Sequence, residues 1–236
     1  MMEALWPGGP LFCQTADGFP LSMDSVLLAH FLSGVRAKRI MDLGCGAGAL
    51  TVLLCVSHPG AAVEGIEIQP EAAVACRKNL AANGYDTAAI RTGDLREFRT
   101  LLPPGAFDLL AANPPYFPPG RGRSAPDNSR AAAREERTCT LEELCAAAEY
   151  LLRRGGAFGL VHRPERLSEI FCAMTRHGME PKRMRLVQYK AAYAPNLALI
   201  EARRGGKPGL NIEKPLILCD ETGGDSAEMR EIYHCG

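Results

Sequence analysis

Residues 113–116, with the sequence Asn-Pro-Pro-Tyr, constrain the fold of this chain more than any other stretch. They follow an apolar run, residues 106–112, in which Asp108 is the only charged side chain, and such a run is typical of a buried strand. Two consecutive prolines exclude a helix and cannot donate to a continuing ladder, so the strand must end there. Because open α/β sheets hold their ligands at the carboxyl ends of parallel strands, this corner is a candidate site.

The residue types of this corner suggest how it would treat a substrate. The side-chain oxygen of Asn113 and the backbone carbonyl of Pro114 are two acceptors that one planar NH2 group can satisfy together. Two acceptors at fixed spacing would orient that amine and favour its pyramidal, nucleophilic form. Pro115 stiffens the corner, and Tyr116 offers a flat face for a planar substrate. On these four residues alone, a Pro-rich turn without a chemical role is the alternative.

A strand, a glycine-rich loop and a helix are expected earlier in the chain. Residues 39–43 form a strand that runs into a loop with the sequence Asp-Leu-Gly-Cys-Gly-Ala-Gly at 42–48, and a helix follows. The glycines let a ligand approach the backbone, and the helix N-terminus presents free N–H groups to a carboxylate or phosphate. A second strand ends in Glu67, 23 residues after Gly44 and close to the ~20 at which a carboxylate accepts from ribose hydroxyls. In this order, the elements predict a nucleotide-type site, with a capping or surface acid as the alternative for Glu67.

A third acidic residue and a long loop follow. Asp94 comes after a strand over residues 87–92, and its carboxylate could accept from an adenine amino group, although an ordinary turn residue is the alternative. Residues 117–137 form a long loop of the kind that often acts as a functional lid. Its arginines could bind phosphates, with a solvated loop as the alternative.

The flanking segments predict further helices and strands. A hairpin is expected around residues 17–18, and Ser22 or Asp24 caps the first helix; Asp24 fits a cap better than a ligand contact. His162 ends a strand near the site edge and is interpreted as structural. The later elements, in order, are a helix over 70–82, a helix from Thr140 to about 153 with a capping box at Glu143, a strand over 157–162, a helix over 164–177, two antiparallel strands over 182–189 and 196–202, a short strand over 215–219 and a helix from about 226.

The composition suits one α/β domain. The chain has 236 residues, of which 47% are hydrophobic, and no stretch approaches the ~18 apolar residues that span a membrane. Residues 1–10 lack the pattern of a signal peptide. Nine cysteines without a C-x-x-C pair indicate reduced thiols in the cytoplasm and no metal site. Residues 153–214 hold 13 Lys and Arg against 5 Asp and Glu, which suggests a basic face for a polyanion or, alternatively, an ordinary solvated surface.

As a set, these motifs resemble those of class I S-adenosylmethionine-dependent methyltransferases that act on planar amino groups. The resemblance covers about residues 21–204. More narrowly, the chain looks like the bacterial family of valine-tRNA adenine-N6 methyltransferases, although Glu135 stands where that family often has His. The stretches that carry this narrower resemblance are 23–28, 133–136, 163–167 and 209–210 with the tail strand.

The resemblance implies a fold and a division of the chain. It implies a Rossmann-like, doubly wound, mostly parallel sheet with an antiparallel C-terminal strand pair. Residues 37–204 would be the catalytic domain, residues 1–36 an N-terminal extension with its helix, and residues 205–236 a C-terminal extension of the same domain.

The resemblance also implies roles, with S-adenosylmethionine as methyl donor and tRNA or another structured RNA as partner. Asn113 and the Pro114 carbonyl would bind the target amine, and Tyr116 would stack on the target base, which must be splayed out of the RNA. The donor would contact Asp24, Asp42, Gly44, Cys45, Gly46, Gly48, Glu67, Ile68, Asp94, Leu95 and Asn113, with the glycine loop on its methionine part, Glu67 on its ribose and Asp94 on its adenine. The candidate RNA contacts are Arg121, Arg123, Arg130, Arg134 and Arg163.

Other functions fit parts of the pattern. Guanine-N2 methylation of ribosomal RNA and glutamine-N5 methylation of a protein also target planar amines, although the 41 residues before Asp42 are few for the helical domain that the latter enzymes usually carry. A nicotinamide dehydrogenase fits Gly44-x-Gly46-x-x-Ala49 but leaves residues 113–116 unexplained. A protein that only binds the donor or RNA has no evident use for an amine clamp.

Overall fold

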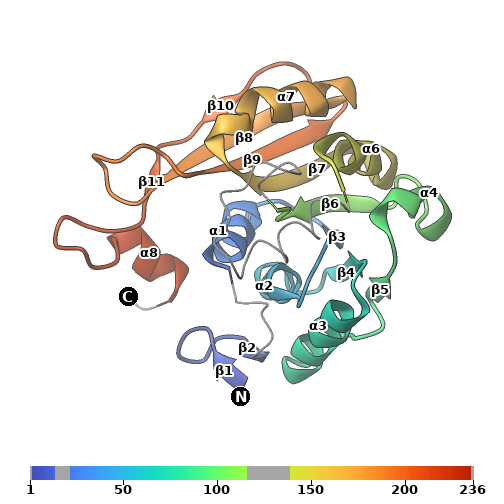
Figure 1. Ribbon diagram of the computed structural model, residues 1–236, viewed down its shortest axis with the longest axis horizontal. Helices are drawn as coiled ribbons and strands as arrows, with labels where there is room; N and C mark the ends of the chain where they lie inside the picture. The colour runs from blue at the N-terminus through green and yellow to red at the C-terminus, as the bar shows by residue number, and fades with distance from the viewer. Residues whose placement is uncertain (1, 14–21, 116–138, 235–236) are drawn as a thin grey trace, which may run out of the picture.

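The apolar runs of the sequence become strands of one central sheet (Figure 1). The computed structural model describes residues 2–13, 22–115 and 139–234. Within these ranges nine strands pair in the order β10-β8-β9-β7-β6-β3-β4-β5, with β11 also on β8. The strands are β3 (Arg39–Leu43), β4 (Ala62–Glu67), β5 (Ile90–Thr92), β6 (Phe107–Ala112), β7 (Leu152–His162), β8 (Met179–Gln188), β9 (Leu197–Arg204), β10 (Asn211–Ile212) and β11 (Leu216–Ile217).

Among the described strands of this sheet, β9 alone runs against the common direction, and β10 and β11 pair parallel with β8. Strands β5, β4, β3, β6 and β7 run parallel, whereas β9 is antiparallel to both β7 and β8. This confirms the predicted doubly wound, mostly parallel sheet with an antiparallel C-terminal pair. The carboxyl ends of the five parallel strands therefore meet at one edge.

Helices cover both faces of the sheet and bury two hydrophobic clusters. Leu109 and Leu110 are neighbours in β6, and because side chains alternate along a strand, they belong to different clusters. One cluster packs against α1, α2, α3 and α8, and the other against α4, α6 and α7. The helices are α1 (Met23–Leu32), α2 (Ala49–Ser57), α3 (Pro70–Ala82), α4 (Phe98–Leu101), α6 (Leu141–Leu151), α7 (Leu167–Arg176) and α8 (Ala227–Ile232).

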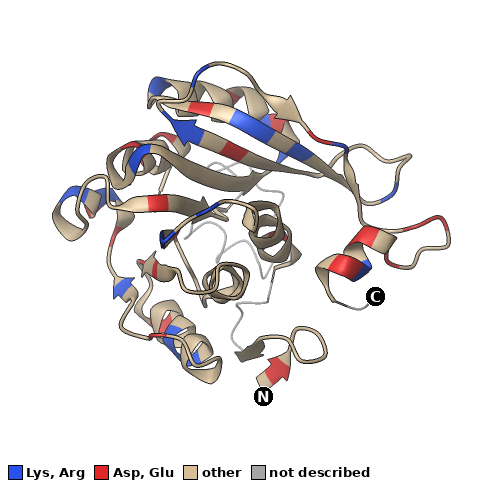
Figure 2. Cartoon of the chain, turned by 180° about the vertical axis from the view of Figure 1, so that it is seen from behind, with Lys and Arg blue, Asp and Glu red and all other residues tan. Residues whose placement is uncertain are grey.

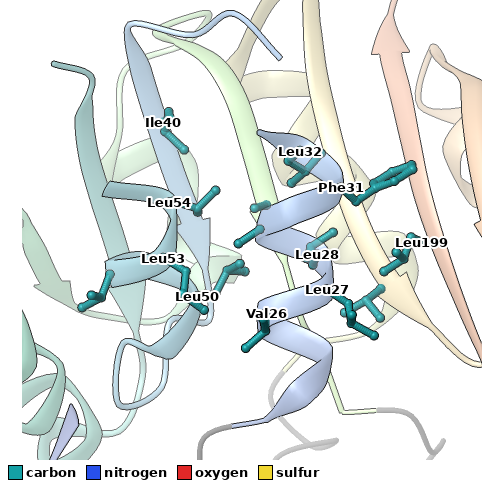
Figure 3. Packing of buried hydrophobic residues seen from close by; sticks show 14 of the residues in the cluster. Val26, Leu27, Leu28, Phe31, Leu32, Ile40, Leu50, Leu53, Leu54 and Leu199 are labelled. Carbon is teal, nitrogen blue, oxygen red and sulfur yellow. The ribbon is translucent and has the colours of Figure 1, made fainter. Parts of the chain in front are cut away.

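Helix α1 is buried on most of its surface. Figure 3 shows Leu28 and Leu32 of α1 between the leucines of α2 and Leu199 of β9. Of the two predicted caps, Ser22 and not Asp24 caps this helix, since the Ser22 hydroxyl oxygen accepts from the backbone N–H of Asp24 at 3.2 Å. The capping box of α6 at Thr140 and Glu143 is also confirmed.

One expectation lies outside the described residues, and the bounds of two strands differ from those predicted. The described hairpin pairs β1 (Met2–Ala4) with β2 (Leu11–Cys13), whereas the hairpin expected at residues 17–18 lies outside the described residues. Strand β5 is shorter than predicted because residues 87–89 form a turn in which the Asp86 carboxylate accepts from Ala88 N at 2.9 Å. Strand β7 begins earlier than predicted, at Leu152. Its pairing with β6 is irregular between Phe107 and Leu109, and the glycines expected to form a turn lie within the strand.

Gly159 lets α1 pack closely on β7. A Cβ at this position would lie 2.4 Å from Cδ1 of the fully buried Leu32. We expect Gly159→Ala to lower the free energy of unfolding by about 1–3 kcal/mol, because the core must shift to accept the methyl group. Gly34 is the matched control, since a Cβ there meets nothing within 4 Å. Urea unfolding measures both variants, and equal stability of the two would contradict this packing.

Candidate functional site

The carboxyl edge of the parallel strands brings together most of the residues predicted from sequence. The glycine loop follows β3, Glu67 ends β4, and Asp94 lies two residues beyond β5. Asn113 directly follows β6, and His162 ends β7. Such an edge, with loops from several strands, is where open α/β sheets place their sites.

The glycine loop has an open side and a packed side. Gly44, Gly46 and Gly48 all have positive φ angles, of 77°, 53° and 89°. A Cβ on Gly44 or Gly46 would meet nothing within 4 Å, whereas a Cβ on Gly48 would lie 2.5 Å from Sγ of Cys76 in α3. The first two glycines therefore leave room for a ligand, and the third permits close packing at the start of α2.

Glu67 braces this loop from the neighbouring strand. Its Oε2 accepts from Gly46 N at 2.9 Å, and its Oε1 accepts from Gln69 N at 2.8 Å. The residue is 6% exposed, and Ile68 beside it is half-buried. Each carboxylate oxygen has a further lone pair, so Glu67 can hold the loop and still accept from a hydroxyl group.

The side chains of Asp42 and Cys45, both predicted to contact the donor, are buried. Asp42 is buried, its Oδ2 accepts from Thr51 Oγ1 at 2.7 Å, and burial raises the pKa of its carboxyl group to about 7. A hydrogen bond with the Cys76 thiol, together with burial, raises the pKa of the Cys45 thiol well above its ordinary value. A ligand on the open side would therefore meet Cys45 through its backbone.

Asp94 is engaged locally at the far end of the edge. It caps a short 3-10 helix (Leu95–Glu97) by accepting from Arg96 N at 2.9 Å, and it pairs with the Arg96 guanidinium at 2.5 Å. The hydrogen bond from Arg96 lowers the pKa of the Asp94 carboxyl group. An adenine contact at Asp94 stays a prediction.

Asn113 is oriented by a residue of α1. Its Nδ2 donates to Oγ of Ser25 at 3.0 Å, and Ser25 is only 4% exposed. Because the Asn113 amide nitrogen faces Ser25, the Asn113 amide oxygen points away from Ser25. The sequence reasoning missed Ser25, since no spacing links two residues 88 positions apart, although Ser25 lies in the 23–28 stretch that carried the resemblance.

The remaining candidates are only partly described. Tyr116, Arg121, Arg123, Arg130 and Arg134 lie outside the described residues. Asp24 is half-buried in the first turn of α1. Arg163 donates from Nη1 to the carbonyl of Asn196 at 2.9 Å.

His162, at the end of β7, is a buried acceptor. Its Nδ1 accepts from Arg163 N at 2.8 Å, and burial lowers the pKa of its imidazole to about 4. The ring is thus neutral near pH 7, which agrees with the structural interpretation.

Some of the arginines of residues 153–214 are paired with carboxylates on the antiparallel strands. Figure 2 shows basic and acidic residues together on these strands. Arg183 contacts Glu201 at 2.8 Å and Glu213 at 3.2 Å, and Arg203 contacts Glu201 at 2.6 Å. Arg185 likewise pairs with a carboxylate of α8 at 2.6 Å. On β8, Arg183 and Arg185 therefore bind the C-terminal segments, which favours the solvated-surface alternative there.

The described ranges hold neither a membrane-spanning helix nor a metal cluster. No helix within them has the length and apolar character to cross a membrane. Within the same ranges, no three His, Cys, Asp or Glu residues are grouped so that they could hold a metal ion.

Comparison with known proteins identifies a methyltransferase family and named relatives. The family model of the methyltransferase small domain matches residues 21–175. A relative from Porphyromonas gingivalis named tRNA1(Val) (adenine(37)-N6)-methyltransferase is 34% identical over 164 residues, which are 66% of this chain and 64% of the relative. A relative of the same name from Aeromonas salmonicida is 28% identical over 184 residues, 77% of this chain and 75% of the relative.

A solved structure is similar over most of the chain. It is described as a predicted O-methyltransferase from Agrobacterium tumefaciens, with a TM-score of 0.72 and 23% identity. The match covers 90% of this chain and 96% of that one, which shows a shared fold.

The buried carboxyl group of Asp42 predicts a pH dependence of stability. Its pKa is about 7 in the folded protein and 3.8 ordinarily, so between these values the folded chain binds a proton that the unfolded chain has lost. The neutral Asp42 carboxyl group therefore adds to the free energy of unfolding at low pH, and this stability is lost as the pH rises from 3.8 to about 7. From about pH 5 to about pH 8, we expect the free energy of unfolding to fall by about 3 kcal/mol more in the wild type than in Asp42→Asn. Urea unfolding at both pH values tests this, and an equal fall in the two proteins would contradict it.

Proposed function

Because the chain belongs to the methyltransferase small domain family, we propose that it transfers a methyl group from S-adenosylmethionine to the N6 amine of an adenine in tRNA. The observation that carries the proposal is Asn113, held by Ser25 at the end of β6 on the same edge as the glycine loop. The names of the relatives support position 37 of a valine tRNA, in the anticodon loop, as the target. A tRNA substrate implies action in the cytoplasm.

The residues present fit the methyl donor. The open side of Gly44 and Gly46 leaves space for its methionine part, and the N-terminus of α2 offers backbone N–H groups to its carboxylate. Glu67 retains acceptor capacity for the ribose hydroxyls, and Asp94 and Leu95 lie further along the edge for the adenine. When bound, the donor supplies an already activated methyl group.

The chain's own part in the reaction is positioning. The Asn113 oxygen and the Pro114 carbonyl would accept from the two hydrogens of the target amine and aim the nitrogen lone pair at the methyl carbon. The buried hydroxyl of Ser25 keeps the Asn113 amide from turning over. The adenine must leave its stack to reach this corner, which favours a loop nucleotide over a paired one.

Methyl-labelled S-adenosylmethionine and unmodified bacterial tRNA test the proposal directly. After incubation, the tRNA is digested to nucleosides and the label is located. We expect the label in N6-methyladenosine, confined to a valine tRNA. Label in a guanine of ribosomal RNA or in a protein glutamine would keep the amine clamp and reject the substrate, and donor binding without any transfer would reject the activity.

Replacing the amine acceptor should separate binding from chemistry. We expect Asn113→Ala to bind S-adenosylmethionine within about twofold of wild type but to lose about 100-fold or more in kcat, because the target nitrogen is no longer held in line. Calorimetric donor titration and single-turnover methylation measure the two effects. Unchanged turnover in this variant would remove Asn113 from its assigned role.

Ser25 should act as a positioning residue. We expect Ser25→Ala to lower kcat about tenfold with the KM for the donor unchanged, because the Asn113 amide loses the partner that fixes its orientation. Ser22→Ala is the matched control on the same helix, since it removes the cap and costs about 1 kcal/mol of stability without touching Asn113. Equal kcat values for the two variants would show that Ser25 only supports the helix.

A further inference from the structure

We propose that the loop between β8 and β9, residues 189–196, is a platform on which unpaired RNA bases beside the target nucleotide stack. The inference rests on the proposed RNA substrate and extends it to a second surface. We call residues 189–196 the tyrosine loop, because Tyr189 and Tyr193 are its aromatic residues.

The tyrosine loop lies at the same edge of the sheet as Asn113. Strands β6, β7, β9 and β8 are consecutive neighbours, His162 pairs with Ala198, and Val187 pairs with Leu197. The end of β8 and the start of β9 therefore share the edge where β6 and β7 end, and in Figure 1 the loop projects beside β11. The two ends of the loop lie two and three strand spacings from β6, about 9 and about 14 Å, the length of about three to four stacked nucleotides.

The two tyrosines present aromatic surface to solvent. Tyr189 is 48% exposed and Tyr193 is 57% exposed. Their ring centroids lie 5.9 Å apart in an edge-to-face arrangement, so the two rings hold each other in place. The other tyrosines that the structure describes, Tyr85, Tyr150 and Tyr233, are only partly exposed.

The loop is held in a defined conformation. Tyr193 N donates to the Lys190 carbonyl at 2.9 Å, and Gln188 Nε2 donates to the Tyr193 carbonyl at 2.7 Å. Arg163, at the end of β7, donates to the Asn196 carbonyl at 2.9 Å and so ties the loop to the strand between it and Asn113. A preorganised aromatic surface binds a partner at a low cost in conformational entropy.

Carboxylates flank the loop, so RNA could contact it through its bases but not through its phosphates. The neighbouring segment after β11 carries Asp220, Glu221 and Asp225, and Cys219 N donates to the Tyr189 carbonyl at 2.9 Å. Lys190 Nζ lies 3.3 Å from the Glu221 carbonyl. Carboxylates repel a phosphate backbone, whereas a ring face accepts any unpaired base. Bases released when the target adenine is splayed out would regain stacking on this loop.

The affinity of single variants for RNA tests this platform. The probe is a fluorescein-labelled RNA stem-loop with the sequence of the valine tRNA anticodon arm, titrated with protein and followed by anisotropy. We expect Tyr193→Ala to raise Kd about tenfold, about 1.4 kcal/mol. Tyr193→Phe keeps the ring and should stay within about twofold of wild type. Val74→Ala, a change at an exposed apolar residue of α3, is the surface control and should not change Kd.

The salt dependence of Kd and the methylation activity distinguish a failure of the platform from a failure of the proposed function. Because no phosphate contact is removed, the slope of log Kd against log salt should be the same in Tyr193→Ala and wild type. An unchanged Kd in Tyr193→Ala overturns the platform and leaves the proposed function standing. This result is expected if the tyrosine loop binds a protein partner and not RNA. Wild-type protein that binds the stem-loop through Tyr193 but methylates no RNA supports the platform and rejects the proposed function, and wild-type protein without RNA affinity overturns both.

Discussion

The parallel pairing of β4, β3, β6 and β7 determines where every other functional group lies. Parallel strands end at the same edge, so a glycine loop, an acidic residue and an Asn-Pro-Pro corner from distant parts of the chain become neighbours. The pairing is fixed at the opposite edge by Asp108, whose Oδ2 accepts from Lys38 N at 2.8 Å and Arg39 N at 2.9 Å. Arg153 of β7 donates to Oδ1 of Asp108 and so links β7 to β6.

Helix α1 connects this sheet to the chemistry of the site. Its leucines are buried against α2 and the strands, and Leu32 fills the space that Gly159 leaves on β7. This packing fixes Ser25 in the first turn, where its hydroxyl meets the Asn113 amide. The hydrophobic core thus sets the orientation of the Asn113 amide through Ser25. A small shift of α1 would change the direction in which the Asn113 oxygen points.

The sequence predicts the parts of this fold that depend on local signals. The bounds of β3, β4 and α3 match the expected residues 39–43, 62–67 and 70–82, because apolar runs, caps and turn residues lie within each segment. The Ser25–Asn113 bond and the arginine pairs of β8 could not be predicted, because each depends on which distant strands become neighbours. Residues 153–214 show the same limit: their charged residues are visible in the sequence, whereas the pairing of Arg183 with Glu201 and Glu213, and of Arg185 with Glu228, appears only once the strands pair.

A double-mutant cycle of Ser25→Ala and Asn113→Ala on kcat tests most directly whether α1 acts through the Asn113 amide. If Ser25 works only by orienting that amide, the double variant should be no slower than Asn113→Ala alone, because nothing is left to orient. The coupling energy would then equal the whole effect of the Ser25 change. Losses that multiply, so that the double variant is slower by the product of the two single effects, would show that Ser25 acts independently and would contradict this account.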